Sequence, residues 1–248
     1  MSDIPQIFYI KTIIELINSF IIYDNSLLDC NKYLNNLKLK HYYFSKYNSL
    51  RYCNDDKFRE YIRSIIQPNK ISLNLDSSNI RDVSMLSDIY ELDLTRCYNI
   101  QDVSMLGNLY KLNLLGCRNI KDISMLGKVH TLILTCCPQI TDVSMLSNVH
   151  TLFLDYCINL SDVSMLRNVK ILNLSYCKNI TDVSMLGNVH ILDLSYCDKI
   201  TDVSMLGNVH KLNVYNCTNI KNISMLRNIY ILDLSFYNHK YMLKHNIY

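Results

Sequence analysis

A five-residue segment recurs eight times at intervals of 20 residues, and this repeat constrains the fold more than any other feature of the chain. The segment Asp82-Val83-Ser84-Met85-Leu86 returns unchanged at Asp102, Asp142, Asp162, Asp182 and Asp202, and with small changes at Asp122 and Asn222. Each copy is followed by an alternating Leu-x-Leu pair, except that Val214 replaces the second leucine of its pair. A period sustained in this way is typical of a solenoid, in which each repeat buries its apolar edge against the next.

Two apolar patterns divide each repeat. Leu192 and Leu194 alternate with polar residues, which is the period of a half-buried strand. From Ile200 to Leu212 every third residue is apolar, and a period near three favours 3₁₀ or extended backbone over a long α-helix. We therefore predict a strand, a turn and a short return arc in each repeat, with all strands in one parallel sheet. The segment 71–75 supplies a first strand, followed by a shorter turn that lacks the cysteine of the later repeats.

The repeat has a recognisable signature. Val189-x-x-Leu192-x-Leu194-x-x-Cys197-x-x-Ile200 resembles the leucine-rich repeat, with cysteine at the Asn/Cys position as in the cysteine-containing class. The resemblance covers about residues 71–235. It implies an α/β solenoid, a leucine-rich-repeat horseshoe with one parallel sheet and short 3₁₀ or extended return arcs.

The first 70 residues lack the repeat. Their apolar spacing predicts helices over 7–23, 25–37 and 56–67, the last capped by Asp55 or Asp56. We therefore expect a helical N-terminal domain over 1–70, the solenoid over 71–237 and a C-terminal tail or cap over 238–248. The simplest role of the N-terminal helices is to cover the apolar edge of the first strand, as solenoids require.

Part of this N-terminal segment resembles a divergent F-box. The resemblance rests on Ile4-Pro5, Asp24, Leu27-Leu28, Cys30, Lys32 and Leu34. The segment departs from the pattern because Ile4 replaces leucine, no acid follows Pro5 and the chain has no tryptophan. The resemblance implies that Ile4, Pro5, Leu27, Leu28 and Leu34 dock the adaptor subunit of a cullin–RING ubiquitin ligase, while the repeats select its substrate.

Because the repeats are in phase, each position forms a column along the solenoid. The cysteines lack the close pairs of zinc sites and the torsion of disulfides, so we expect buried thiols. The aspartates are expected to accept backbone N–H bonds at turns. The methionines are expected to pack between arcs, with an adaptable binding stripe as the alternative. One further column holds His130, His150, His190 and His210, at a position that accepts different residue types in other repeats. We expect no specific function there, and a metal site or a pH switch is the alternative.

Columns that vary on the outward face of the sheet are the candidate binding residues. Leu115, Ile133 and Phe153 form an apolar patch on an otherwise polar face. A stripe of tyrosines lies at its rim, and two acids complete the set: Tyr156, Tyr176, Tyr196, Asp155 and Asp193. Exposed apolar patches and tyrosines mark partner surfaces, although neutral drift of the repeats would also place isolated apolar residues there.

Composition narrows the classes of function. With 25 Lys and Arg against 22 Asp and Glu, the net charge of +3 argues against a nucleic-acid binder. The chain contains no nucleophile elbow, P-loop or metalloprotease motif, so we expect neither an enzyme nor a cofactor or metal. The apolar stretch 7–23 contains Lys11 and Glu15, which predicts no membrane span, and it lacks the features of an export signal.

These observations predict a protein–protein interaction scaffold that binds its partner on the concave face. A substrate receptor of a ubiquitin ligase is the narrower hypothesis, and a nucleic-acid or ligand-binding solenoid is the alternative. Reduced thiols and the missing export signal predict an intracellular, cytoplasmic location. The bias toward Ile, Asn, Lys and Tyr suits an AT-rich genome such as that of a large DNA virus, in which case the location is a host cell.

Overall fold

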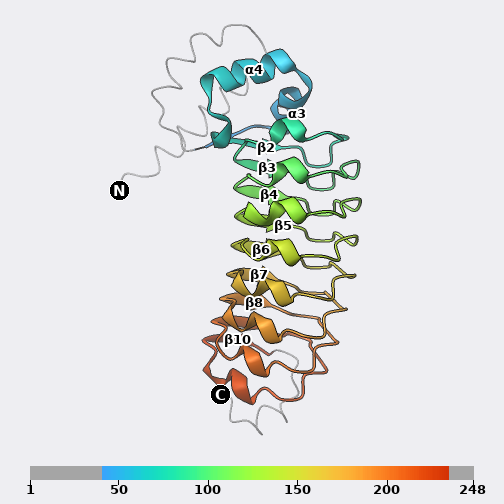
Figure 1. Ribbon diagram of the computed structural model, residues 1–248, viewed down its shortest axis with the longest axis vertical. Coiled ribbons are helices and arrows are strands. Elements are labelled where there is room, and N and C mark those ends of the chain that lie inside the picture. Colours follow the sequence, from blue (N-terminus) through green and yellow to red (C-terminus); the bar gives the residue numbers. More distant parts are fainter. Residues whose placement is uncertain (1–40, 235–248) are drawn as a thin grey trace, which may run out of the picture.

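The computed structural model describes residues 41–234, and its strands stack into one parallel sheet (Figure 1). Within these residues the sheet has ten strands, ordered as in the chain from β1 to β10. They are β1 (Tyr42–Tyr43), β2 (Ile71–Asn74), β3 (Glu91–Asp93), β4 (Lys111–Asn113), β5 (Thr131–Ile133), β6 (Thr151–Phe153), β7 (Ile171–Asn173), β8 (Ile191–Asp193), β9 (Lys211–Asn213) and β10 (Ile231–Asp233). From β3 onward each residue pairs with its equivalent in the next repeat, as Leu92 does with Leu112. The predicted parallel sheet is confirmed.

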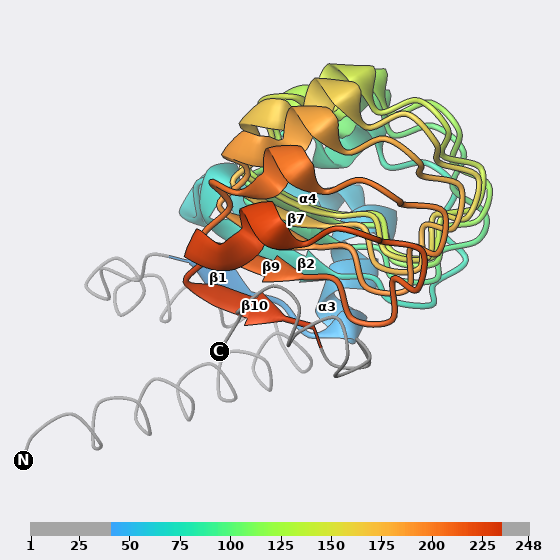
Figure 2. The same ribbon diagram turned by 90° about the horizontal axis from the view of Figure 1, so that it is seen from below.

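A 3₁₀ turn lies on the return arc between successive strands from β2 onward. These turns are η2 (Ser84–Leu86), η3 (Ser104–Leu106), η4 (Ser124–Lys128), η5 (Ser144–Leu146), η6 (Ser164–Asn168), η7 (Ser184–Asn188), η8 (Ser204–Leu206) and η9 (Ser224–Asn228). Viewed along the solenoid, the strands form one side of the section and the short helices another (Figure 2). The predicted return arcs are therefore confirmed as 3₁₀ turns joined by extended backbone.

The core follows the period of three that the sequence shows. Val83, Leu86 and Ile89 are buried, because a 3₁₀ turn has three residues per turn and brings every third side chain to the same side. The seven cysteines of the repeat column are free and buried. Each thiol donates to a leucine carbonyl of the preceding repeat, as Cys177 Sγ does to Leu154 O at 3.1 Å. The prediction of buried thiols is confirmed.

The methionine column differs from our prediction. Met85 packs against the core, but the other seven side chains, from Met105 to Met225, are 45–62 % exposed. The period of three explains the difference. Val163 and Leu166 both point inward, so Met165, one position before the leucine, is rotated by about 120° and points outward.

Two helices cover the first repeat. They are α3 (Lys46–Asn54) and α4 (Asp56–Ile65), followed by η1 (Pro68–Lys70). The predicted helix over 56–67 is confirmed as α4, with Asp55 as its N-cap accepting from the Phe58 amide at 3.0 Å. Helix α3 and strand β1 were not predicted. The predicted helices over 7–23 and 25–37, the F-box-like residues and the 238–248 tail lie outside the described residues.

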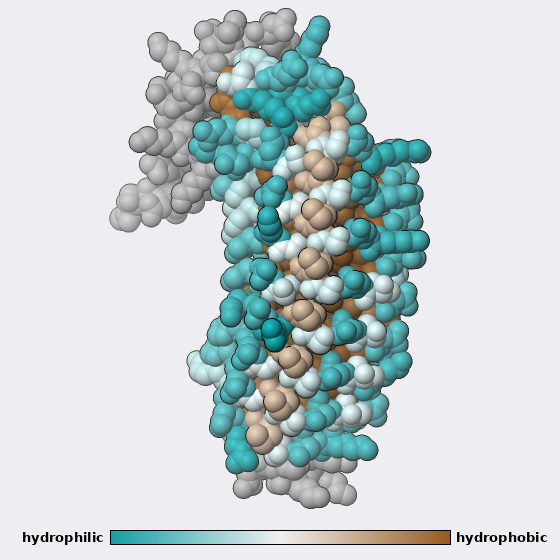
Figure 3. All heavy atoms as spheres, viewed as in Figure 1, coloured by the Kyte–Doolittle hydropathy of each residue, from teal (hydrophilic) through white to brown (hydrophobic). Residues whose placement is uncertain are grey.

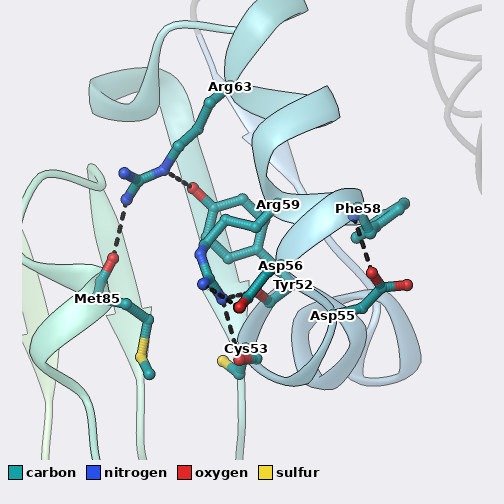
Figure 4. A network of polar contacts seen from close by, with 8 residues as sticks. All are labelled: Tyr52, Cys53, Asp55, Asp56, Phe58, Arg59, Arg63 and Met85. Atoms are coloured by element: carbon teal, nitrogen blue, oxygen red, sulfur yellow. Dashed lines mark hydrogen bonds and ion pairs between the residues drawn. The ribbon is translucent and has the colours of Figure 1, made fainter.

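An arginine joins this helical pair to the solenoid (Figure 4). Arg63 Nε donates to the Tyr52 hydroxyl at 2.8 Å, and Arg63 Nη2 donates to the Met85 carbonyl at 2.8 Å. The same Nη2 lies 2.8 Å from Oδ1 of Asp88. Arg59 Nη1 donates to the Tyr52 carbonyl at 3.0 Å, which ties α4 to α3. Arg63 therefore connects α4 to the first arc, while α3 packs against β2.

Candidate partner-binding face

A turn hydrogen bond fixes the end of most strands. In the column between the paired leucines, an Asn or Asp side chain accepts the N–H of the residue two positions later, as Asn173 Oδ1 does from Ser175 at 2.9 Å. The same bond occurs at Asn74, Asp93, Asn113, Asp193 and Asn213. In β5 and β6 this column holds Ile133 and Phe153, whose side chains have no acceptor, so these two repeats cannot make the bond.

The two apolar residues lie side by side. Ile133 pairs with Phe153 in the register of β5 and β6, and both are partly exposed. Two further residues extend the patch, because Ile171 and Ile191 pair in β7 and β8 on the same face of the sheet. We call these four residues the apolar band. It crosses four adjacent strands diagonally.

Ile171 and Ile191 were not among the predicted binding residues. A signal was available, since residues two apart on a strand face the same side and Ile171 precedes Asn173 by two positions. The predicted binding columns begin between the paired leucines and do not include the position before the first leucine.

The predicted tyrosine stripe is a stacked ladder at the carboxyl ends of β6, β7 and β8. The ring centroids of Tyr156 and Tyr176 are 4.2 Å apart, and those of Tyr176 and Tyr196 are 4.1 Å apart. All three have left-handed backbone, with φ of 61°, 61° and 62°. This conformation costs a residue with a Cβ about 1–2 kcal/mol. The neighbouring hydroxyls of Tyr196 and Tyr156, together with desolvation, raise the pKa of Tyr176.

A second aromatic ladder borders the other end of the strands. Tyr110, His130 and His150 stack with centroid separations of 4.5 and 4.6 Å, and His190 stacks on His210 at 4.5 Å. Desolvation and the neighbouring His150 lower the pKa of His130. Among residues 41–234 no three His, Cys, Asp or Glu side chains gather as metal ligands. The histidines are therefore pairs within an aromatic ladder.

The remaining predicted residues lie around the apolar band. Asp155 accepts from the Thr135 hydroxyl at 2.7 Å, and Asp193 accepts from Asn213 Nδ2 at 3.0 Å. Leu115 is partly exposed beyond the end of β4. The eight predicted residues thus lie in strands β5, β6 and β8 or just beyond the ends of β4 to β8. Within the described part of the chain, no helix has the length and apolar character needed to cross a bilayer.

Two solved structures from Listeria monocytogenes are similar to this chain. Internalin F aligns with a TM-score of 0.56 at 23 % identity over 69 % of this chain and 57 % of the internalin chain. Internalin C2 aligns with a TM-score of 0.52 at 25 % identity over 65 % of this chain and 79 % of that one. The match therefore spans little more than half of the internalin F chain. No protein-family model matches the chain and no curated protein matches its sequence. The fold is a leucine-rich-repeat solenoid, as the repeat signature implied.

Proposed function

We propose that the chain is a protein-interaction scaffold that binds a partner on the concave sheet, across the repeats from β5 to β8. The observation that carries the proposal is the loss of the turn bond at Ile133 and Phe153. An Asn or Asp at either position would restore a bond of about 1 kcal/mol, and these two repeats instead carry adjacent apolar residues on a partly exposed surface.

The surroundings of the apolar band support a protein partner. Apolar residues with aromatic neighbours are typical of the centre of a protein interface, and polar groups are typical of its rim. Here the tyrosine ladder offers aromatic surface and hydroxyls, while Asp155 and Asp193 add charge beside the band. The acids on this face disfavour the alternative of a nucleic-acid ligand. No catalytic role is proposed.

The test is capture of partners by the full-length protein from nuclease-treated cell lysate. The variant Ile133→Asn/Phe153→Asn carries the residue that the same column holds in β4 and β7, so it keeps the local turn. Proteins retained by the unaltered chain and lost by this variant would support the concave site. Capture that is equal for both chains would contradict it, and capture that disappears with nuclease would favour the nucleic-acid alternative.

The narrower proposal is a substrate receptor of a cullin–RING ubiquitin ligase. It rests on the F-box-like residues Ile4, Pro5, Leu27, Leu28 and Leu34. The test compares recovery of the adaptor subunit by the full chain and by a variant in which Leu27, Leu28 and Leu34 are glutamine, after circular dichroism shows that both fold. Recovery by the first alone supports the receptor, and recovery by neither leaves the N-terminal helices as a cap.

The chain's location belongs to the same proposal. The column thiols donate hydrogen bonds to leucine carbonyls, so the reduced form contributes to the fold. This supports a reducing intracellular compartment such as the cytoplasm, which in the viral case is that of the host cell.

A further inference from the structure

A stripe of methionines runs along the side of the solenoid that bears the 3₁₀ turns. Figure 3 shows it as a row of moderately hydrophobic side chains between polar ones. Met105 to Met225 are each 45–62 % exposed, one in each of seven successive repeats. Exposed apolar side chains gathered in a row can mark an interaction site, and methionine is favoured where a surface must adapt to its ligand.

The architecture of the repeat does not explain why this column is methionine. In the segment Asp182 to Leu186, Val183 and Leu186 are buried and Asp182 accepts the Ser184 amide at 2.8 Å. Met185 belongs neither to the core nor to the turn bond. Another exposed column, which precedes the strands, varies among Tyr, His and Lys, whereas this one is methionine in all eight repeats. A function of the stripe accounts for that uniformity.

Charge next to the stripe indicates the chemistry of its partner. Asp142, Asp162, Asp182 and Asp202 are all exposed, three positions before a methionine in each of four successive arcs. On those four arcs (141–149, 161–169, 181–189 and 201–209) the one basic residue is Arg167. Open hollows separate adjacent arcs, such as one of about 330 Å³ lined by Asp162, Asp182 and Met185. The stripe is therefore an apolar row with an acidic row beside it.

We propose that this face, centred on Met145, Met165, Met185 and Met205, binds a basic amphipathic helix of a partner protein. A helix advances about 5.4 Å per turn. Neighbouring strands of the solenoid are about 4.8 Å apart. In a helix that lies along the solenoid, successive turns therefore stay close to successive repeats over three or four repeats. Apolar side chains at i, i+4 and i+7 would contact the methionines, and lysines or arginines beside them would face the aspartates. This site is independent of the concave one.

The test uses methyl-¹³C-methionine NMR on the full-length protein. The probe is a synthetic helical peptide of Leu and Lys, about 18 residues or five turns long, with its leucines on one face. The methionine signals are assigned by single Met→Leu substitutions, and Met85, which packs against the core, serves as an internal reference. We expect the peptide to shift the methyl signals of the four central methionines, and its affinity to fall as salt is raised.

Matched controls distinguish binding at this site from non-specific binding. The variant Asp142→Asn/Asp162→Asn/Asp182→Asn/Asp202→Asn keeps the turns, because Asn222 already accepts the Ser224 amide at 2.9 Å, and it should weaken binding about tenfold or more. Ile133→Asn/Phe153→Asn should leave binding unchanged. The proposal is overturned if the methyl signals do not move. Three control probes are a peptide of the same composition with leucines on all faces, a Leu/Glu peptide and phosphatidylcholine vesicles. The proposal is also overturned if any of them shifts the methionine methyl signals as much as the amphipathic Leu/Lys peptide does.

Discussion

Ile133 lies directly beside Phe153 on adjacent strands, and neither side chain can accept the backbone hydrogen bond that Asn113 and Asn173 make in the repeats on either side. The site proposed here thus coincides with two adjacent repeats in which the sheet lacks a recurring stabilising contact. Natural proteins often carry such a cost where a surface serves binding.

Ile133→Asn and Phe153→Asn should each change the free energy of unfolding by less than about 1 kcal/mol, because the new turn bond offsets the lost apolar contact. The reciprocal change Asn113→Ile should be destabilising by about 1 kcal/mol, since it removes the bonds to the Leu115 amide and the Thr95 hydroxyl. Urea unfolding measures all three. A large loss of stability at Ile133 or Phe153 would place these side chains in the core and not on the binding face.

The strands and return arcs were predictable from the sequence, because each has a characteristic period of apolar residues. Alternation gave the strands and a period of three gave the arcs, as in β8 and η7, because burial on one side imposes these periods directly. The concave columns followed from the same alternation. Helix α3 was missed because its apolar residues, among them Leu50 and Tyr52, are too few to mark a helical face, and its start depends on Ser45 as N-cap.

Other features of the site depend on geometry that no period encodes. The left-handed backbone at Tyr156, Tyr176 and Tyr196 had a single glycine in its column as a signal, Gly116 with φ 71°. The stacking of these rings follows from strand spacing and backbone direction together. The outward methionine column, in contrast, does follow from the period of three, because Met165 is out of phase with the buried Val163 and Leu166.

Alkylation should distinguish two cysteines that are adjacent in the chain. Cys136 is exposed, whereas Cys137 is buried and desolvation raises the pKa of its thiol. Because the thiolate is the reactive form, iodoacetamide should modify Cys136 in the folded protein and reach Cys137 only after unfolding. Peptide mass spectrometry of native and urea-treated protein resolves the two sites. Equal modification of both in native protein would contradict the buried thiol column.

Acid should weaken the solenoid through its aspartate column. The Ser144 amide and hydroxyl lower the pKa of Asp142, and the equivalent serines do so in the other repeats that carry aspartate. A folded-state pKa below the unfolded value adds stability above about pH 4, and this stability is lost as pH falls through the folded pKa. A variant with Asp122, Asp142 and Asp182 changed to Asn should therefore lose less stability on acidification, as measured by urea midpoints across pH. An unchanged pH dependence would show that these turns do not contribute to it.

Gly127 should resist substitution by alanine. A Cβ at this position would overlap the carbonyl oxygen of Met145 on the next arc, so Gly127→Ala forces neighbouring arcs apart. We expect a loss of about 1–3 kcal/mol, the usual cost of overpacking. Ser147→Ala, at the equivalent position of the next repeat, should cost less than about 0.5 kcal/mol. Thermal unfolding compares the two variants, and equal midpoints would mean that the arcs can separate at little cost.

Arg63 should be needed to hold the helical cap on the first repeat. Its guanidinium contacts the Tyr52 hydroxyl, the Met85 carbonyl and Asp88 at the same time, and a lysine cannot reproduce this forked geometry. We expect Arg63→Lys and Arg63→Ala both to lower stability. The loss should be about 1–3 kcal/mol for alanine, because it leaves the Tyr52 hydroxyl and the Met85 carbonyl without this donor.

Hydrogen exchange should locate the effect, with faster exchange in α3, α4 and β2 and little change beyond β5, since a solenoid repeat contacts only its neighbours. Arg51→Ala is the matched control, because Arg51 pairs with Asp55 within the helical pair. Uniformly faster exchange along the whole solenoid in Arg63→Ala would show that the cap and repeats unfold as one unit, contrary to the local role assigned to Arg63.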